Sequence, residues 1–284
     1  MQAEFIREFE KKVEKTIDEY KLAERGDKII LACSGGKDSI TTLYLLKEFG
    51  YDVEALMIDL LIGKWSDENL ENTKKFCREH KIKLHIIDMR KEFGCSICYI
   101  RSGIQTKMKL SNCAICGVIK RWLLNKKARE LNANKIATGH NLDDEAETIL
   151  MNLFAGNPEL SLGMGPKNGI ITNEKFVQRI KPLYFFTNEE VRKYSEAKNF
   201  PVLYDPCPCS VNAFRRDIRQ WISDLEKHDP GIKMSIVKNF LEMLPSLRKT
   251  YKTERKLKSC RVCEEPSSND ICKRCELIKI LRAS

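Results

Sequence analysis

The stretch Leu31-Ala-Cys-Ser-Gly-Gly-Lys-Asp-Ser39 decides the fold of this chain. It overlaps a short apolar run, Lys28–Cys33, that predicts a buried strand, and it leads into a helix expected over Ile40–Phe49. Two glycines let the backbone approach an anion closely, and the N–H groups at the start of the helix point at that anion. The stretch therefore predicts a phosphate-binding loop at the end of a strand.

This loop supplies seven candidate nucleotide ligands: Cys33, Ser34, Gly35, Gly36, Lys37, Asp38 and Ser39. Asp38 would face a phosphate only across a metal ion, so we expect Mg²⁺. The GxxxxGK[ST] spacing of a Walker loop is absent. SGGKDS after a first strand resembles the PP-loop ATP pyrophosphatases. The resemblance implies that ATP is cleaved between its α and β phosphates and that a substrate oxygen is adenylated.

Strands and helices alternate along the next part of the chain, which predicts an α/β fold with a doubly wound, Rossmann-like parallel sheet. Further strands are expected over Val53–Asp59, Lys83–Asp88, Lys135–Thr138 and Val177–Leu183. The expected helices are Asp67–His80, Cys113–Leu131 and Asp143–Phe154, with a loop over 156–176. We expect an amphipathic helix in 1–26, a catalytic domain in 27–210, a helical extension in 211–255 broken at Asp229–Gly231 and Pro245, and a cysteine module in 256–284.

A second motif, Thr138–Ala146, follows the fourth expected strand and opens a helix. Gly139 permits close approach to a nucleotide, and Asp143 and Asp144 favour the helix N-terminus electrostatically. Both aspartates could simply complement the helix dipole. In the family that this motif resembles, the second aspartate is catalytic, which implies a catalytic Asp144 and a supporting Asp143. The remaining candidate ATP contacts are His140 in this motif and Met57, Ile58 and Asp59 beside the adenine.

Twelve cysteines, eight of them in four CxxC pairs, indicate metal binding or thiol chemistry rather than disulfides, because we expect a reducing, cytoplasmic location. Cys113 and Cys116 open a helix, where the N-terminal position lowers a thiol pKa. Lys120 lies one turn further on the same face and is either a functional cation or a solvated lysine. Cys207, between two prolines, offers a third thiolate. Three thiolates can hold a [4Fe–4S] cluster with one open iron that binds hydrosulfide, or the same cysteines can form a persulfide or disulfide relay.

The segments Asn112–Asn152 and Pro206–Arg216 resemble the TtuA-type tRNA 2-thiouridine synthetases and their archaeal and eukaryotic relatives. The resemblance implies that ATP activates the C2 oxygen of a uridine and that a cluster on Cys113, Cys116 and Cys207 supplies sulfur. Cys207 is preferred to Cys209 because the family pattern is Cys-Pro-x-Ser. Lys120 and Asp144 would assist adenylation. The sulfur donor would be a ubiquitin-like thiocarboxylated carrier protein or free sulfide, and relatives commonly form homodimers.

The spacing Cys260-x₂-Cys263-x₈-Cys272-x₂-Cys275 predicts a Zn²⁺ site, because so short a segment needs a metal to fold. The sequence also departs from the family pattern. A further zinc module that usually precedes the first helix is not seen, so part of the tRNA contact surface is expected to differ. Cys95 and Cys98 are an additional pair, either a sulfur relay, a second metal site or an incidental pair in a loop.

The formal charge of +10 favours a polyanionic partner, here tRNA, and no apolar run predicts a membrane helix. The candidate tRNA contacts are Lys126, Lys127, Arg129, Arg179, Lys181, Arg215, Arg216 and Arg219, which could equally form a solvated basic face. The alternatives are another PP-loop tRNA ligase, such as a lysidine-type enzyme, and a non-catalytic RNA-binding zinc protein. Neither explains all of the motifs.

Overall fold

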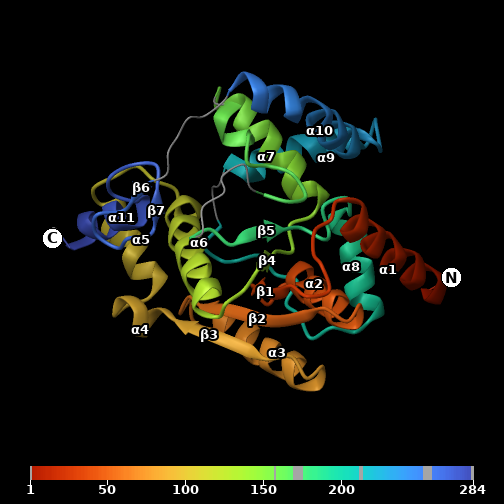
Figure 1. Cartoon of the computed structure of the whole chain (residues 1–284), viewed down its shortest axis with the longest axis horizontal. Helices are drawn as coiled ribbons and strands as arrows, with labels where there is room; N and C mark the ends of the chain where they lie inside the picture. The colour runs from red at the N-terminus through yellow and green to blue at the C-terminus, as the bar shows by residue number, and fades with distance from the viewer. Residues whose placement is uncertain (1, 157, 169–174, 211–213, 252–257, 283–284) are drawn as a thin grey trace.

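A five-stranded parallel sheet forms the centre of the computed structural model (Figure 1). The structure describes residues 2–156, 158–168, 175–210, 214–251 and 258–282. The strands run in the order β3-β2-β1-β4-β5 and are β1 (Lys28–Cys33), β2 (Asp52–Asp59), β3 (Leu84–Asp88), β4 (Lys135–Ala137) and β5 (Gln178–Ile180). The predicted doubly wound fold is confirmed, although the last strand is shorter than expected over Val177–Leu183.

Helices cover both faces of the sheet because successive strand residues point to opposite sides. Ile29 and Leu31 pack on one side and Ile30 on the other. The first face is covered by α1 (Gln2–Glu19), α2 (Lys37–Glu48), α3 (Lys64–Glu79) and α8 (Asn188–Ala197). The second face is covered by α4 (Met89–Phe93), α5 (Ile97–Gln105) and α6 (Asn112–Glu130). Thr187 and Glu190 form a capping box at the start of α8.

The helix α5 was not expected from the sequence, for which an incidental pair in a loop was one of three interpretations of Cys95 and Cys98. Cys98 instead lies in the first turn of α5, after the N-cap Ser96. Ile97, Ile100 and Ile104 are fully buried against the sheet, so the helix is stabilised by three isoleucines on one face. The loop interpretation of Cys98 is therefore wrong.

Three helices form a separate layer beyond the sheet edge: α7 (Leu142–Phe154), α9 (Phe214–Glu226) and α10 (Ile232–Thr250) (Figure 1). The expected break at Asp229–Gly231 separates α9 from α10, but the break expected at Pro245 is absent because α10 continues through this proline. Val237, Phe240 and Leu244 bury one face of α10 against this layer, which holds the helix together around the proline. Within the expected loop 156–176, η1 (Pro158–Ser161) is a short 3-10 helix.

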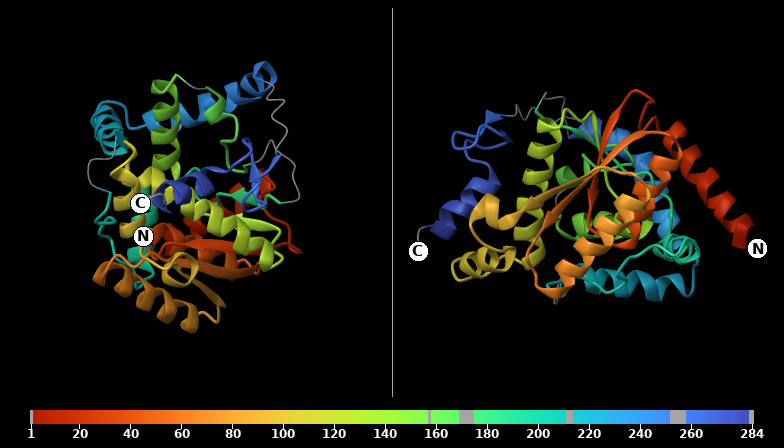
Figure 2. Two further views of the ribbon diagram at one scale, coloured as in Figure 1. Left: turned by 90° about the vertical axis from the view of Figure 1, so that its left-hand side faces the viewer. Right: turned by 90° about the horizontal axis from the view of Figure 1, so that it is seen from below.

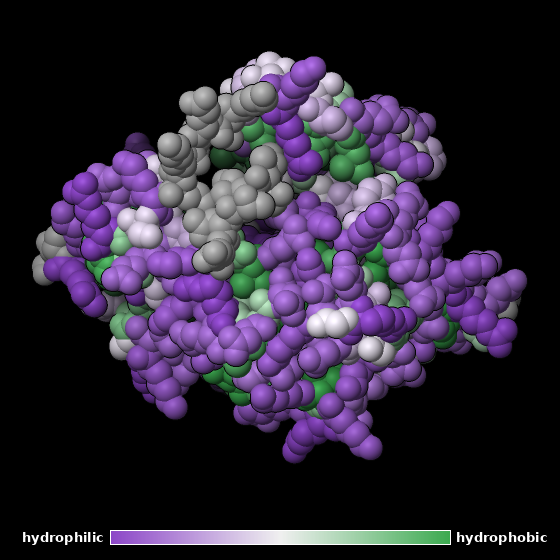
Figure 3. Space-filling model, viewed as in Figure 1, coloured by the Kyte–Doolittle hydropathy of each residue, from purple (hydrophilic) through white to green (hydrophobic). Residues whose placement is uncertain are grey.

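The C-terminal cysteines form a small module of β6 (Lys258–Ser259), β7 (Pro266–Ser267) and α11 (Lys273–Arg282). Figures 1 and 2 show it beside α5 and α6, at the opposite end of the molecule from the N-terminus. Leu277 of α11 enters the core between α5 and α6. The surface in this view is mainly hydrophilic, with small apolar groups (Figure 3), and no helix among the described residues could span a membrane.

Candidate active site

The phosphate loop follows β1, which pairs with β2 on one side and with β4 on the other. The strand order reverses direction at β1, so the loop lies at the switch point of the sheet. Gly35 has a φ of +80°, which favours glycine, and α2 begins after Gly36 with no side-chain cap. The first N–H groups of α2 are therefore free to bind an anion. The hydroxyls of Ser34 and Ser39 lie 3.2 Å apart and order the turn.

Lys37 and Asp38 are held on the first turn of α2. The Lys37 Nζ donates to Asp38 Oδ1 at 2.7 Å and to Asn188 Oδ1 at 2.6 Å. Burial raises the pKa of Asp38, Lys37 opposes this, and the nearby charge of Asp144 adds to it. Two carboxylates thus face one another beside the loop, which is the ligand chemistry that Mg²⁺ prefers. Cys33 lies behind them with a buried thiol whose pKa is raised by that burial.

The second motif touches the phosphate loop through Gly139. A Cβ on Gly139 would lie 2.6 Å from the Asp38 carbonyl carbon and 2.7 Å from the Ser39 backbone nitrogen. Asn141 Nδ2 also donates to Asp38 Oδ1 at 3.0 Å, and Asn141 caps α7 in a capping box with Asp144. The close approach that the sequence assigned to a nucleotide is, in the structure, an approach between the two loops.

His140, in the second motif, lies near several cations. Its Nδ1 is 2.9 Å from Thr138 Oγ1. Burial lowers the pKa of His140 to about 4, Asp144 opposes the shift, and Lys181 and Arg215 strengthen it. The imidazole is consequently neutral at physiological pH and can donate or accept a single hydrogen bond.

We expect the His140 ring to titrate near pH 4, well below an ordinary histidine at about 6.5. Because the unfolded chain then binds more protons between these values, this histidine makes folding stability rise with pH across that window. The NMR chemical shift of its ring carbon against pH measures the midpoint directly. A midpoint at or above 6 would show that burial and the surrounding cations do not lower the pKa of this ring.

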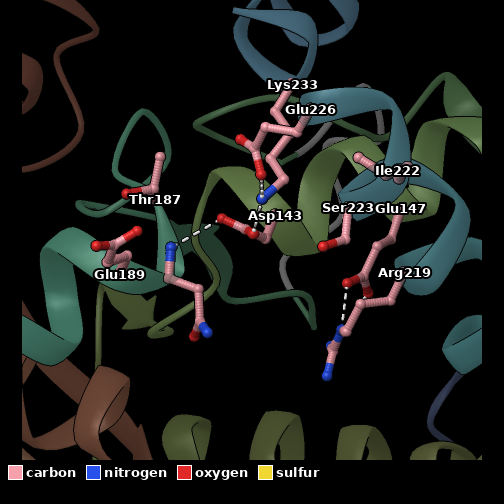
Figure 4. Close-up of a pocket in the computed structure, with 10 residues that line it drawn as sticks. Asp143, Glu147, Thr187, Glu189, Arg219, Ile222, Ser223, Glu226 and Lys233 are labelled. Carbon is pink, nitrogen blue, oxygen red and sulfur yellow. Dashed lines mark hydrogen bonds and ion pairs between the residues drawn. The ribbon is translucent and has the colours of Figure 1, made fainter. Parts of the chain in front are cut away.

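Asp143 lines a cavity of about 320 Å³ between α7, α8, α9 and α10 (Figure 4). Its Oδ1 accepts a hydrogen bond from Lys233 at 2.6 Å, and its Oδ2 accepts one from the Asn188 backbone at 2.8 Å. Both carboxylate oxygens are bound by protein groups, so Asp143 ties three helices together. Its predicted supporting role in catalysis remains a prediction.

Met57 and Ile58, the predicted adenine contacts, are almost fully buried and belong to the cores on opposite faces of the sheet. Their side chains therefore do not form one exposed apolar slot. Asp59 Oδ1 accepts from the Leu61 backbone at 3.1 Å, which shapes the turn after β2. Contact of this strand end with adenine stays a prediction.

Two of the predicted tRNA contacts instead hold a buried glutamate. Glu147 of α7 is 1% exposed and accepts from Arg219 at 2.6 Å and from Arg215 at 3.2 Å (Figure 4). Arg215 also lies 3.5 Å from Asp144. The sequence did not indicate that Glu147 is buried and paired with arginines. Its partners lie in α9, and only the packing of α9 on α7 brings them to it.

Lys181 and Arg129 are likewise committed to protein contacts. Lys181 is 8% exposed and donates to Glu145 Oε1 at 2.6 Å. Arg129 pairs with Glu265 and thereby fastens the cysteine module to α6. The expectation that these two side chains belong to a free basic face is therefore wrong.

Two of the three predicted cluster ligands, Cys113 and Cys116, lie in the first turn of α6, and Cys207 lies near enough to Cys116 for their charges to interact. Cys113 is exposed and Cys116 partly buried, while Cys207 comes from the turn after Pro206. Burial raises the pKa of Cys116, Lys120 lowers it, and the charge of Cys113 raises it further. Burial also raises the pKa of Cys207, to which Cys116 contributes. The lowered thiol pKa expected at this helix start is thus not found for Cys116, because burial outweighs the helix position.

The thiol spacing distinguishes the two candidate metal centres. Among the described residues, the C-terminal cysteines form the one such group with all ligand atoms within 4.8 Å of one another. Tetrahedral zinc, with bonds of about 2.3 Å, needs sulfurs about 3.8 Å apart. A cubane cluster binds each cysteine to a different iron, so its ligands stand farther apart. Cys113, Cys116 and Cys207 do not form such a group in the described part of the chain, and their binding of a cluster stays a prediction.

The C-terminal set fits a single Zn²⁺ ion. Cys263 Sγ and Cys272 Sγ are 3.6 Å apart. The backbone N–H groups of Val262 and Cys272 donate to Cys260 Sγ at 3.5 and 3.2 Å. Burial alone would raise the pKa of Cys260, but these hydrogen bonds lower it to about 6, which favours a thiolate ligand.

A row of cations connects the cysteines with the ATP loops. The charge of Cys116 acts on Arg121, Arg121 lies close enough to Arg179 to affect it, and Arg179 in turn acts on His140. Burial first, and then Arg121, lower the pKa of Arg179 to about 10. Neither arginine pairs with an acid in the described ranges. The two halves of the site therefore share one positively charged environment.

Comparison with known proteins decides the family. The model of the PP-loop domain matches residues 5–226. The chain belongs to the PP-loop family. It is 37% identical over 273 residues to the tRNA-5-methyluridine(54) 2-sulfurtransferase of Pyrococcus horikoshii, with 96% of this chain and 85% of the relative covered.

Members of the family resemble this chain over nearly its full length. Cytoplasmic tRNA 2-thiolation protein 1 of Aspergillus niger is 32% identical, covering 97% of this chain and 80% of its own. The solved U34-tRNA thiolase NcsA of Methanococcus maripaludis, with its [4Fe-4S] cluster, superposes with a TM-score of 0.81 at 30% identity. That match covers 98% of this chain and 89% of the thiolase. The expected family is confirmed.

Proposed function

We propose that this protein is a tRNA 2-thiolation enzyme that uses ATP to activate the C2 oxygen of a uridine and then replaces that oxygen with sulfur. One observation supports the proposal above all others. The phosphate loop contacts the second motif through Gly139 and Asn141, and charge effects run from Cys116 through Arg121 and Arg179 to His140 of that motif.

The loop residues bind and orient ATP in this proposal. The free N–H groups of α2 and the Lys37 ammonium hold the phosphates, and Asp38 with Asp144 would hold Mg²⁺. Mg²⁺ bound there would neutralise charge on the phosphates and so favour attack of the uridine oxygen on the α-phosphorus. Adenylation turns a poor oxygen leaving group into a good one, so AMP leaves when sulfur arrives.

We propose that Lys120 acts between the two steps. Its ammonium lies near enough to Cys116 to lower the pKa of that thiol. We propose that it stabilises the negative charge that develops at the uridine or on the α-phosphate. A cluster on Cys113, Cys116 and Cys207 would supply the sulfur atom as a nucleophile.

The proposal is tested with full-length protein that has been loaded with cluster anaerobically and supplied with unmodified tRNA, Mg-ATP and sulfide. Nucleoside mass spectrometry should find 2-thiouridine with ATP and none with an ATP analogue whose α–β bridge is a methylene group. Nuclease fragments would map the wobble or T-loop position. AMP release with no thiouridine would overturn the proposed product. Absence of any AMP release would favour the non-catalytic RNA-binding alternative.

Arg216 is the arginine in α9 that best fits an RNA contact. It is exposed and has no ion pair among the described residues, unlike Arg215 and Arg219. We expect Arg216→Ala to reduce the slope of log affinity against log salt for tRNA by about one, with unchanged melting temperature. The matched variant Arg219→Ala should instead lower stability by about 1–3 kcal/mol, because Glu147 loses a partner. An unchanged salt slope in Arg216→Ala would remove this residue from the tRNA surface.

A further inference from the structure

Two cysteines outside the three predicted cluster ligands lie side by side in the fold. Cys98 comes from the first turn of α5 and Cys209 from the turn after Cys207, and their thiols lie near enough to act on one another. Both are partly exposed, so a small donor or a carrier's terminus can reach them. Cys95, the other member of the CxxC pair, instead donates to the Phe93 carbonyl at 3.5 Å.

Arg101 holds this pair of thiols in place. Its Nη2 lies 3.1 Å from Cys98 Sγ, and its guanidinium also hydrogen-bonds to the Cys209 thiol. The side chain is 8% exposed, and its Nε has no hydrogen-bond partner in the described structure. A buried guanidinium directed at two sulfurs provides a fixed positive charge beside any anionic sulfur species formed there.

The pair lies against the predicted sulfur-transfer site. The Cys209 carbonyl accepts a hydrogen bond at 3.1 Å from Asn112, the first residue of α6. The charge of Cys209 also acts on both Cys116 and Cys207. Sulfur released from Cys98 would therefore appear next to the thiols that we expect to use it.

We propose that Cys98 and Cys209 form a dithiol that takes sulfane sulfur from a persulfide donor and releases it as hydrosulfide beside Cys116 and Cys207. This inference rests on the proposed thiolation function and deepens it, because it names the chemical class of a sulfur donor. Contact of two thiols with a shared arginine is the geometry that such a transfer needs.

The chemistry balances in two exchanges. The Cys98 thiolate attacks the outer sulfur of R–S–SH, so an S–S bond forms on Cys98, the donor S–S bond breaks, and R–SH leaves. Cys209 then attacks the Cys98 sulfur, which forms a Cys98–Cys209 disulfide and expels HS⁻ with one proton. The transferred sulfur gains two electrons, one from each cysteine. A small-molecule or protein dithiol reductant restores both thiols for the next turnover.

Peptide mapping tests the transfer without measuring tRNA thiolation. Cluster-loaded, full-length protein is treated anaerobically with glutathione persulfide in the absence of reductant, alkylated and digested. We expect a Cys98–Cys209 disulfide in the parent protein and in Cys95→Ser, the matched control. Cys209→Ser should instead retain a persulfide on Cys98, which is heavier by one sulfur atom. Absence of the disulfide, or persulfide spread equally over Cys95 and Cys98, would overturn the proposal.

Donor dependence provides the second readout. The ratio of persulfide-driven to sulfide-driven thiolation should fall at least about tenfold in Cys98→Ser and stay constant in Cys95→Ser. A Cys98→Ser protein that loses its iron would identify Cys98 as a cluster ligand and refute the transfer role. If the parent protein makes no thiouridine from sulfide, the proposed function fails. The disulfide mapping still tests, independently of that result, whether Cys98 and Cys209 take sulfur from a persulfide.

Discussion

Gly139→Ala is expected to reduce ATP-to-AMP turnover by at least about 100-fold, because the new methyl group must displace the phosphate loop. The Cβ would lie 2.6 Å from the carbonyl carbon of Asp38 and 2.8 Å from its oxygen. These neighbours are backbone atoms at the start of α2 and cannot rotate away as a side chain could. We also expect a loss of about 1–3 kcal/mol in the free energy of unfolding. Steady-state AMP release and thermal unfolding measure the two effects.

Gly163→Ala is the matched control for this substitution. A Cβ on Gly163 meets no atom within 4 Å, and its backbone is outside the left-handed region. Turnover in Gly163→Ala should equal that of the parent protein. Full turnover in Gly139→Ala would mean that the two loops need not touch, and the arrangement described for the ATP site would then be incorrect.

Cys263→Ser is expected to reduce zinc affinity by at least about 100-fold and to loosen two helices outside the module. The module is packed on α5 and α6 rather than attached by a linker alone. Leu277 lies in their core, and a Cβ on Gly103 of α5 would lie 2.5 Å from Leu281. Trp122 of α6 packs against the zinc cysteines, with Arg274 over its ring at 4.1 Å. Losing the metal should therefore disturb the helices that carry Cys98 and Cys116.

Hydrogen exchange and metal analysis check this expectation together. Amide protection should fall over residues 97–105 and 112–130 but stay constant in α2 and α8, which pack on the other face of the sheet. Cys95→Ser should keep its zinc and its protection pattern. A Cys263→Ser protein with full zinc content and unchanged exchange would show that Cys263 is not a zinc ligand and would contradict the four-cysteine site.

The sequence predicted the structure best where residues close together in the chain form the feature by themselves. Buried strands such as Lys28–Cys33 are short apolar runs, and the loop after that strand has the glycines and hydroxyls that an anion requires. The four C-terminal cysteines are closely spaced in sequence, so their convergence required no knowledge of the fold. Helix α5 was missed because it is short and contains Gly103, although Ser96 caps its N-terminus.

Charge partners and thiol neighbours were decided by the tertiary structure alone. The sequence alone suggests that Arg219 is a free basic residue. In the structure α9 packs on α7, and Arg219 Nε lies 2.6 Å from Glu147 Oε1. Cys98 and Cys209 acquire a shared arginine only when α5 packs beside the turn that follows Cys207.

The amino-acid sequence by itself thus determined the α/β class, the phosphate loop and the candidate metal ligands, because local spacing and residue chemistry specify them. The tertiary structure alone decided which of the cations are free and which cysteines meet, because those contacts join segments far apart in the chain.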